Sequence, residues 1–222
     1  MNHPPIRTFH PRRGRMGPRH ADAHTALWPA HGLLIEDGDR SPLDLDELFG
    51  RDNPKVLEIG FGMGDTLAAT ARADPGRDYL GIEVHTPGIG NLLALIQDQD
   101  LSHVRVARGD AMQLAHRLAA GSLDAIHVYF PDPWPKARHH KRRLIQPGNV
   151  ALLRERLRAG GILHCATDWP DYAEAMAATL DADPGLEPVD RDRAGRPETK
   201  FELRGTRAGR PITDLRYRRR TC

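Results

Sequence analysis

Short apolar runs alternate with segments of helical periodicity along most of the 222-residue chain. The apolar runs predict seven β-strands, because a short continuous apolar run between turn residues is typical of a buried strand. These strands are expected at residues 56–60, 79–84, 104–108, 123–130, 162–167, 199–204 and 212–218. Between them, apolar stripes of period 3.6 predict helices over residues 89–96, 150–157 and 169–180. Gly160 and Gly161 are expected to end the second of these helices.

The alternation of strands and helices indicates the fold class. Strand–helix–strand units imply right-handed crossovers and parallel strands. The last two expected strands follow a segment rich in Pro and Gly, which favours a C-terminal antiparallel hairpin. We therefore predict a Rossmann-like α/β fold, with a seven-stranded, mostly parallel sheet and helices on both faces. A single domain is expected over residues 26–222, preceded by a flexible basic arm over residues 1–25, which are rich in Pro, Gly, Arg and His.

Composition narrows the class of protein. Apolar residues make up 39% of the chain and charged residues 28%, which is typical of a globular protein. No apolar run has the roughly 20 residues that a membrane helix needs, and the N-terminus has no apolar stretch of signal-peptide length. The two cysteines, Cys165 and Cys222, form no disulfide framework and argue against a structural zinc site, although 12 histidines leave a histidine-rich site open. We expect a cytoplasmic protein with no metal, no membrane association and no obligatory protein partner.

Cations are confined to three short segments. Residues 1–20 contain five arginines and no acid, residues 136–143 contain five lysines and arginines and no acid, and residues 216–220 contain four arginines and no acid. Because the net charge is only +2, the rest of the chain is acidic. Basic segments on an otherwise acidic protein indicate binding to a polyanion such as a nucleic acid. The alternative is that the two terminal segments are only solvated tails.

A glycine-rich turn follows the first expected strand. Gly60, Gly62 and Gly64 are spaced G-x-G-x-G, and Glu58 stands two residues before the first of them. A dinucleotide site prefers G-x-G-x-x-G, with a pyrophosphate at the helix N-terminus. A carboxylate at position 58 would repel a pyrophosphate, but it suits a sulfonium ligand with a free amino group. The turn therefore favours S-adenosylmethionine over NAD.

Acidic residues also end the next two expected strands. Glu83 lies 19 residues past Gly64, about where an acid accepts hydrogen bonds from ribose hydroxyls. Asp110 follows the strand at 104–108, where it could meet the adenine side of the ligand. Ligands of open α/β sheets bind at the carboxyl ends of the strands, so these acids and the glycine turn are expected to share one site.

A proline-rich segment follows the fourth expected strand. The sequence Pro131-Asp132-Pro133-Trp134-Pro135-Lys136 places an acid, an aromatic ring and a cation in a stiff loop at the carboxyl edge of the sheet. Such a loop could hold a planar base by hydrogen bonds to Asp132 and by the face of Trp134. The alternative is that the tryptophan packs on the core.

Two further segments carry chemistry that is less specific. Asp168 follows the fifth expected strand, where it could face the site or cap the next helix. Residues 199–202, with the sequence TKFE, combine a hydroxyl, a cation, an aromatic ring and an acid.

Taken in order, the motifs EIGFGMG, GIEVH, FPDPWPKARHHKRR, ATDW and TKFE resemble the bacterial tRNA (guanine-N7-)-methyltransferases. This resemblance covers residues 54–205 and implies a Rossmann-like class I methyltransferase fold. It also implies transfer of a methyl group from S-adenosylmethionine, which leaves as S-adenosylhomocysteine, to N7 of guanosine 46 in the tRNA variable region. Pro135 and His140 depart from the pattern of the family.

The resemblance implies roles for individual residues. Asp132 corresponds to the catalytic position. The cofactor-binding positions correspond to Glu58, Gly60, Gly62, Gly64, Glu83, Asp110 and Asp132. The substrate-binding positions correspond to Lys136, Asp168, Thr199, Lys200, Phe201 and Glu202. The RNA-contacting positions correspond to Arg138, His139, His140, Lys141, Arg142 and Arg143.

Three other functions remain open from the sequence. The segment 131–134 loosely resembles the motif of enzymes that methylate exocyclic amino groups. The glycine turn is compatible with an NAD-dependent oxidoreductase. The basic segments are compatible with a non-catalytic RNA-binding module that retains the fold.

Overall fold

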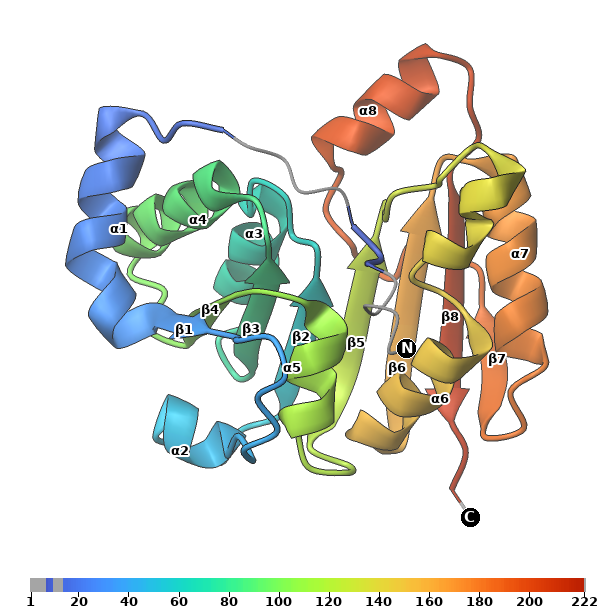
Figure 1. Cartoon of the computed structure of the whole chain (residues 1–222), viewed down its shortest axis with the longest axis horizontal. Helices are drawn as coiled ribbons and strands as arrows, with labels where there is room; N and C mark the ends of the chain where they lie inside the picture. Colours follow the sequence, from blue (N-terminus) through green and yellow to red (C-terminus); the bar gives the residue numbers. More distant parts are fainter. Residues whose placement is uncertain (1–6, 10–13, 222) are drawn as a thin grey trace, which may run out of the picture.

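A sheet of eight strands forms the centre of the protein (Figure 1), whose computed structural model describes residues 7–9 and 14–221. The strand order is β1-β4-β3-β2-β5-β6-β8-β7. The strands are β1 (Gly32–Leu34), β2 (Lys55–Ile59), β3 (Asp78–Glu83), β4 (Val104–Arg108), β5 (Leu123–Tyr129), β6 (Leu157–Thr167), β7 (Leu186–Asp190) and β8 (Thr213–Arg219).

The first six strands in this order pair in parallel, whereas β8 pairs antiparallel with both β6 and β7. The predicted Rossmann-like α/β fold with a C-terminal antiparallel hairpin is therefore confirmed. The strand order reverses between β2 and β5, which are neighbours in the sheet although β3 and β4 separate them in the chain. A reversal of this kind leaves a crevice at the carboxyl ends of the strands, where ligands of α/β sheets bind.

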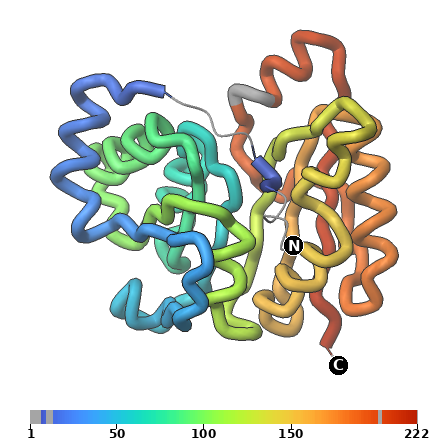
Figure 2. The backbone as a smooth tube through the Cα atoms, in the orientation of Figure 1, coloured from blue at the N-terminus to red at the C-terminus, as the bar shows by residue number. Residues whose placement is uncertain are grey.

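Helices cover both faces of the sheet (Figures 1 and 2). The helices are α1 (Pro18–His31), α2 (Leu45–Phe49), α3 (Asp65–Ala73), α4 (Thr86–Gln99), α5 (Ala111–Arg117), the 3₁₀ helix η1 (Ala137–Arg142), α6 (Pro147–Arg156), α7 (Pro170–Asp181) and α8 (Lys200–Arg207). In the part of the chain that the structure describes, no helix is both long enough and apolar enough to cross a lipid bilayer.

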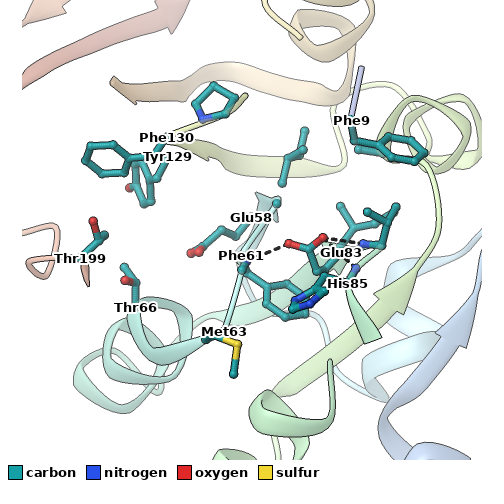
Figure 3. Close-up of a pocket in the computed structure, with 18 of the residues that line it drawn as sticks. Phe9, Glu58, Phe61, Met63, Thr66, Glu83, His85, Tyr129, Phe130 and Thr199 are labelled. Carbon is teal, nitrogen blue, oxygen red and sulfur yellow. Dashed lines mark hydrogen bonds between the residues drawn. The ribbon is translucent and has the colours of Figure 1, made fainter. Parts of the chain in front are cut away.

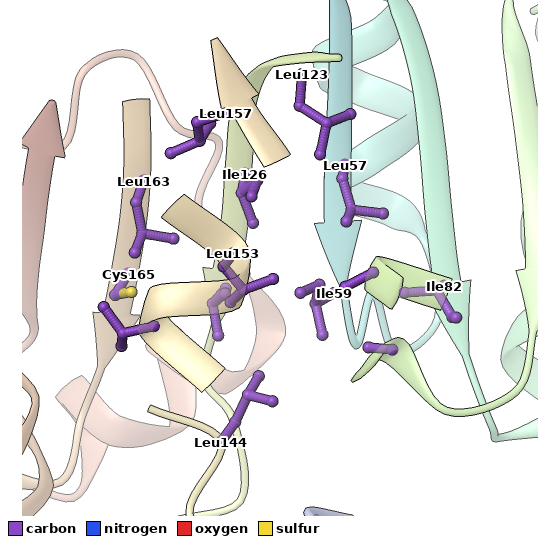
Figure 4. Close-up of a cluster of buried hydrophobic side chains, with 14 of the residues drawn as sticks. Leu57, Ile59, Ile82, Leu123, Ile126, Leu144, Leu153, Leu157, Leu163 and Cys165 are labelled. Atoms are coloured by element: carbon purple, nitrogen blue, oxygen red, sulfur yellow. The ribbon is translucent and has the colours of Figure 1, made fainter. Parts of the chain in front are cut away.

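Two hydrophobic clusters hold the layers together. One lies between the sheet and α1, α3 and α4. The larger cluster lies on the opposite face, under α5, α6 and α7. Figure 4 shows its centre, where Leu57 and Ile126 of adjacent strands face Leu153 of α6. All three side chains are fully buried, so the sheet is fixed beneath the site.

The strand predicted at residues 199–204 is wrong, because these residues belong to α8. Thr199 accepts a hydrogen bond from the backbone N–H of Glu202, and the Glu202 side chain accepts from the backbone N–H of Thr199. This capping box starts a helix and outweighs the strand propensity of the apolar residues that follow. The hairpin partner of β8 is instead β7, which the sequence pattern did not reveal.

Two further predictions differ from the structure in detail. Gly160 and Gly161 lie inside β6, because α6 ends at Arg156 and the chain enters the sheet directly at Leu157. The edge strand β1 was not predicted, since its three residues are too few to show a pattern. With β1 and β7 added and residues 199–204 removed, the described sheet has eight strands rather than seven.

The N-terminal arm is partly ordered as a helix. Residues 18–25, predicted to be flexible, form the first half of α1, which begins with Pro18 at its first position. Ala23 is buried, and α1 packs against α4 at Gly90, where an added Cβ would lie 2.9 Å from the carbonyl oxygen of His20. The absence of a side chain on Gly90 therefore permits the contact. The rest of the predicted arm includes residues 1–6 and 10–13, which lie outside the described residues.

A close contact between α4 and the glycine turn predicts the effect of one substitution. An added Cβ on Gly88 would lie 1.8 Å from the carbonyl oxygen of Gly62. We expect Gly88→Ala to lower the free energy of unfolding by about 1–3 kcal/mol, because backbone must shift to relieve the clash. Chemical denaturation followed by circular dichroism measures this change.

Gly148→Ala is the matched control. Gly148 also lies in the first turn of a helix, but an added Cβ there meets nothing within 4 Å. It should leave stability unchanged or raise it by up to about 1 kcal/mol. Equal stabilities of the two variants would contradict the tight contact at Gly88.

Candidate active site

A cavity of about 320 Å³ opens at the carboxyl ends of β2, β3 and β5, where the strand order reverses. The glycine turn after β2 forms its floor, and the proline-rich segment after β5 forms one wall. Thr199 and Leu203 of the α8 region and Phe9 of the N-terminal segment complete it. Figure 3 shows Glu58 at the centre, with Glu83 and Thr199 on opposite sides. The cavity therefore brings together residues from distant parts of the chain.

The glycine turn has the conformation that its sequence predicts. Gly60, Gly62 and Gly64 have φ angles of 74°, 61° and 80°, in the left-handed region that glycine adopts most readily. An added Cβ on Gly64 would lie 2.7 Å from Cβ of Leu92, so helix α4 packs directly on the turn. At Gly60 an added Cβ meets nothing within 4 Å. The turn is thus packed on its α4 side, and its backbone lines the cavity.

Glu83 at the end of β3 holds this turn in place. One carboxylate oxygen accepts from the backbone N–H of Gly62 at 2.9 Å. The other accepts from Val84 at 2.6 Å and from His85 at 3.0 Å. A carboxylate has about four acceptor sites, so the oxygen that contacts Gly62 retains capacity for a ligand hydroxyl. Glu83 therefore lies where the sequence predicted it, and it also orders the turn.

Glu58 is a buried carboxyl group in the cavity wall. Its side chain is 3% exposed, and its Oε2 atom has no hydrogen-bond partner among the described residues. Burial raises the pKa of Glu58 to about 8, although the positive charge of Arg196 opposes this shift. A group with this pKa is mostly protonated at neutral pH. A cationic ligand beside it would stabilise the ionised form, so the site favours a positively charged amine.

Asp110 is close to the cavity but does not line it. Its carboxylate accepts from the backbone N–H of Met112 at 2.7 Å and caps α5. Its neighbours Gly109 and Ala111 do line the cavity. The role predicted for Asp110 at the adenine side is untested, and in this structure its side chain acts as a helix cap.

The proline-rich loop is held in a strained conformation. Phe130, which precedes the loop, and Trp134, which lies within it, have φ angles of 51° and 48°. Such values cost a bulky residue about 1–3 kcal/mol each, so the surrounding contacts must enforce them. The N–H of Phe130 donates to the carbonyl of Ala166 at 2.7 Å, and Nε of Arg143 donates to the carbonyl of Pro133 at 3.0 Å. These contacts position Asp132, which lines the cavity.

Trp134 does not present its ring face to the cavity, as the sequence suggested it could. The side chain is 3% exposed. The guanidinium of Arg142 lies 5.0 Å from its ring centroid, and the ring of His139 packs on it edge to face at 5.9 Å. The alternative interpretation, in which this tryptophan packs inside the protein, is therefore correct.

Glu202 is part of a buried ion-pair network. Its carboxylate accepts from Arg193 at 2.6 Å and from Arg196 at 2.8 Å. Arg196 is buried and also donates to Asp214 of β8 at 2.9 and 3.0 Å. Glu202 is 4% exposed and does not line the cavity, whereas Thr199 does. Glu202 thus fixes α8. In this conformation its side chain does not reach the cavity and could not contact a substrate there.

The remaining predicted substrate residues lie at the edge of the site. Asp168 accepts from Arg210 at 2.7 Å and does not line the cavity. Lys136 is exposed at the start of η1 and does not line the cavity either. Lys200 and Phe201 are in α8, but their side chains lie outside the described part of the structure.

A chain of hydrogen bonds runs behind the cavity wall. The hydroxyl of Tyr129, which lines the cavity, lies 3.2 Å from Nδ1 of His164, and Nε2 of His164 lies 2.7 Å from Asp214. Burial lowers the pKa of the neighbouring His127 to about 3, so this ring is neutral. Arg196 contacts the faces of Tyr129 and Phe130 at 5.3 and 5.4 Å. The sequence alone does not reveal this cluster, because strand pairing and the irregular segment before α8 bring its residues together.

The basic segment 136–143 is mostly exposed, but its last residue is not. Arg138, Lys141 and Arg142 are exposed on η1. The Arg143 side chain is 3% exposed, forms an ion pair with Asp171 and packs over the ring of Tyr172 at 4.7 Å. In this structure the charge of Arg143 is used to hold the loop, and its place among the RNA-contacting positions stays a prediction. His139 and His140 are half-buried.

The C-terminal arginines also have partners within the protein. Arg216 pairs with Asp190 at 2.7 Å, and both Arg218 and Arg220 pair with Glu187. These pairs hold β7 and β8 together. The terminal segment thus carries less unpaired charge than its composition indicates, and η1 is the stronger candidate for binding a polyanion.

Comparison with known proteins identifies the family. Residues 52–215 match a family described as "Putative methyltransferase". A protein of Alkalilimnicola ehrlichii named tRNA (guanine-N(7)-)-methyltransferase is 51% identical, over 97% of this chain and 93% of that protein. The chain belongs to the tRNA (guanine-N(7)-)-methyltransferase family. A second member of this family, from Halorhodospira halophila, is 50% identical over 96% of this chain and 95% of its own length.

Solved structures agree with the fold of this family but do not by themselves give the reaction. The 16S rRNA methyltransferase KamB superimposes with a TM-score of 0.61 at 17% identity, over 85% of this chain and 99% of that chain. The [4+2]-cyclase SpnF superimposes with a TM-score of 0.55 at 18% identity, over 90% of this chain and 94% of that chain. Because a methyltransferase and a cyclase share this fold, the fold alone does not identify the reaction, which must be argued from the site.

The buried network predicts that Glu202 stabilises the fold. Glu202→Gln removes one charge from a buried ion-pair network and leaves Arg196 underpaired. We expect the free energy of unfolding to fall by about 3–5 kcal/mol, as measured by chemical denaturation.

The control for this prediction is Glu198→Gln, the same chemical change at an exposed position just before α8 begins. It should alter stability by no more than about 0.5 kcal/mol. If Glu202→Gln keeps wild-type stability and only weakens tRNA binding, the predicted substrate contact would replace the structural role.

Proposed function

We propose that this protein transfers the methyl group of S-adenosylmethionine to N7 of guanosine 46 in the variable region of tRNA. The proposal depends on one observation above all, the buried Oε2 atom of Glu58, which has no hydrogen-bond partner among the residues that the structure describes, in a cavity that Asp132 also lines. Membership of the tRNA (guanine-N(7)-)-methyltransferase family supports the base, the atom and the kind of RNA. Position 46 and the identity of the donor come from the sequence resemblance, and they are part of the proposal.

The residues of the cavity fit this donor. When bound, S-adenosylmethionine supplies an electrophilic methyl group on a sulfonium ion. Glu58 would pair with the amino group of its methionine part, since no described residue of the protein forms a hydrogen bond with Oε2. The turn at Gly60 and Gly62 lets the backbone approach closely, and Glu83 retains acceptor capacity for a ribose hydroxyl. A pyrophosphate, in contrast, would meet the carboxylate of Glu83 and would gain no ion pair from Glu58, which argues against the NAD-dependent alternative.

The acceptor side requires positioning more than acid–base chemistry. Guanine N7 has a lone pair in the ring plane and no proton, so no general base is needed at the attacking atom. Correct alignment of the reacting atoms can contribute about 7–11 kcal/mol to a barrier. Asp132, held by the strained loop between Phe130 and Trp134, would stabilise the positive charge that develops on the purine.

Recognition of guanine requires acceptors for N1–H and the exocyclic amino group. Asp132, Glu198 and Thr199 line the cavity and present oxygen atoms from two sides. Asp168 and Glu202, which the resemblance places among the substrate-binding positions, are engaged by Arg210 and by Arg196. We therefore assign guanine recognition to the three cavity residues.

The main test is incubation of the protein with labelled S-adenosylmethionine and bulk unmodified tRNA. Label should enter tRNA, and aniline cleavage should occur at 7-methylguanosine in the variable region. Label on an exocyclic amine, found by nucleoside mass spectrometry, would instead support the amino-group methyltransferase. Binding of tRNA without incorporation of label would support the non-catalytic RNA-binding module.

Asp132→Asn tests the catalytic assignment. Loss of the charge near the purine should lower the rate of transfer on the order of 100-fold or more, because a preorganised charge stabilises the transition state. The variant keeps the size of the side chain, so circular dichroism should report an unchanged fold. Wild-type turnover by this variant would remove Asp132 from the mechanism.

Glu58 predicts how donor-site affinity depends on pH. Because the pKa of Glu58 in the free protein is about 8, pairing with an ammonium group must release a proton below that pH. The affinity for S-adenosylhomocysteine should rise by up to about tenfold per pH unit toward pH 8. Isothermal titration calorimetry in buffers of different ionisation enthalpy measures the affinity and the proton release. In Glu58→Gln both effects should disappear.

The same pKa predicts a change in stability that needs no ligand. As pH rises from 4.5 to about 8, the unfolded chain loses the Glu58 proton while the folded protein keeps it. The contribution of Glu58 to the free energy of unfolding therefore falls as pH rises through that window. Glu58→Gln should be more stable than wild type at pH 8 and lose most of this advantage near pH 4. An advantage that is independent of pH would contradict the raised pKa.

The exposed cations of η1 predict the salt dependence of tRNA binding. Each phosphate contact contributes about 0.7–0.9 to the slope of log affinity against log salt. Replacing Arg138 and Lys141 with alanine should therefore weaken binding and reduce this slope by up to about 2. The control variant has alanine in place of Arg218 and Arg220, which pair with Glu187 within the protein. This variant should have the same slope as wild type. Equal slopes for all three proteins would mean that η1 does not contact the RNA.

A further inference from the structure

The N-terminal residues 7–9 lie at the mouth of the cavity, although no motif marks them in the sequence. Thr8 and Phe9 line the cavity and are half-buried. In Figure 3 the ring of Phe9 lies on the same side as Glu83, whereas Thr199 lies across the cavity. A segment from the beginning of the sequence thus supplies part of the wall on the same side of the cavity as Glu83, the residue that we assign to the ribose.

Trp134 holds this segment against the proline-rich loop. Its Nε1–H donates to the carbonyl oxygen of Thr8 at 3.4 Å. Trp134 is 3% exposed, and a buried indole N–H normally requires an acceptor. The hydrogen bond therefore ties residue 8 to the loop that carries Asp132, which explains why this buried ring belongs to an active-site loop although it offers no face to the cavity.

A second contact lies beyond Phe9 in the sequence. An added Cβ on Gly14 would lie 2.7 Å from Cγ of Pro87 and 3.1 Å from Nε2 of His85, so the backbone of residue 14 packs on the start of α4. His85 also lines the cavity. The described N-terminal residues therefore contact the proline-rich loop on one side of Phe9 and the start of α4 on the other.

We propose that Phe9 is a cofactor-binding residue that covers the nucleoside end of the donor site, and that Trp134 positions it there. This inference rests on the proposed function, because it takes the nucleoside of S-adenosylmethionine as the ligand. Aromatic rings stack on purine bases whatever the base, which suits a half-buried phenylalanine beside Glu83. Since Trp134 connects the two segments, the cover on the donor and the loop that carries Asp132 adopt their positions together.

Binding of S-adenosylhomocysteine to the full-length protein tests the role of Phe9. Phe9→Ala should weaken binding on the order of tenfold, because a stacking contact is lost. Most of the change should appear as faster dissociation in stopped-flow displacement. Phe9→Leu keeps apolar cover without a ring and should fall between Phe9→Ala and wild type. The control Leu34→Ala removes an exposed apolar side chain of β1 that does not line the cavity, and it should bind like wild type.

A double-mutant cycle tests the role of Trp134 as a positioning residue. Trp134→Phe keeps an aromatic ring but removes the N–H that Thr8 accepts. Alone, it should speed dissociation less than Phe9→Ala does. In the Phe9→Ala background it should have almost no further effect, because coupled residues are not additive. Unfolding of each variant by denaturant shows whether the fold is retained.

The outcomes separate this inference from the proposed function. If wild type does not bind S-adenosylhomocysteine, the proposed donor is wrong, and the role of Phe9 is wrong with it. If wild type binds and Phe9→Ala binds equally well, the role of Phe9 is wrong and the proposed function stands. If the effects of the two substitutions add fully, Trp134 does not position Phe9.

Discussion

The buried guanidinium of Arg196 is the interaction that joins the two parts of the site. It donates to Glu202 of α8 and to Asp214 of β8, and it lies over the rings of Tyr129 and Phe130 at the end of β5. A buried charge is tolerated only where its partners stay in place. Arg196 therefore obliges the helix, the C-terminal strand and the start of the proline-rich loop to remain together.

The two sides of the cavity are built by different means. The donor side is built mainly on backbone, because three glycines in left-handed conformations follow β2 and Glu83 accepts from the backbone N–H groups of Gly62 and Val84. The buried side chain of Glu58 lines the same side. The acceptor side consists of side chains that ion pairs position, with Arg143 under the loop and Arg196 beneath α8. A rigid donor side suits a small ligand that is always the same, whereas a side-chain scaffold allows a loop to be shaped around a base.

Local pattern was sufficient for most of the fold and for the conformation of the glycine turn. The strands β2 to β6 and the glycine turn follow from continuous apolar runs and from residue types with few allowed conformations. Strand propensity is misleading at residues 199–204, where the capping box that Thr199 and Glu202 form starts a helix. Whether Trp134 and Arg143 face the cavity or the interior depends on distant partners, Thr8 for the first and Asp171 for the second. Glu202 is turned inward by Arg193 and Arg196, which lie in the irregular segment before α8. No local pattern contains that information.

The place of β8 in the sheet has a consequence for how the protein is made. This strand is inserted between β6 and β7, both of which precede it in the chain, so the edge of the sheet stays incomplete until residue 219 has left the ribosome. Asp214 arrives with the same strand and is a partner of Arg196. Chains fold progressively during synthesis. The wall formed by α8 must therefore be among the final parts to assemble. In a nascent chain, the glycine turn can form before the wall that would hold a base beside it is complete.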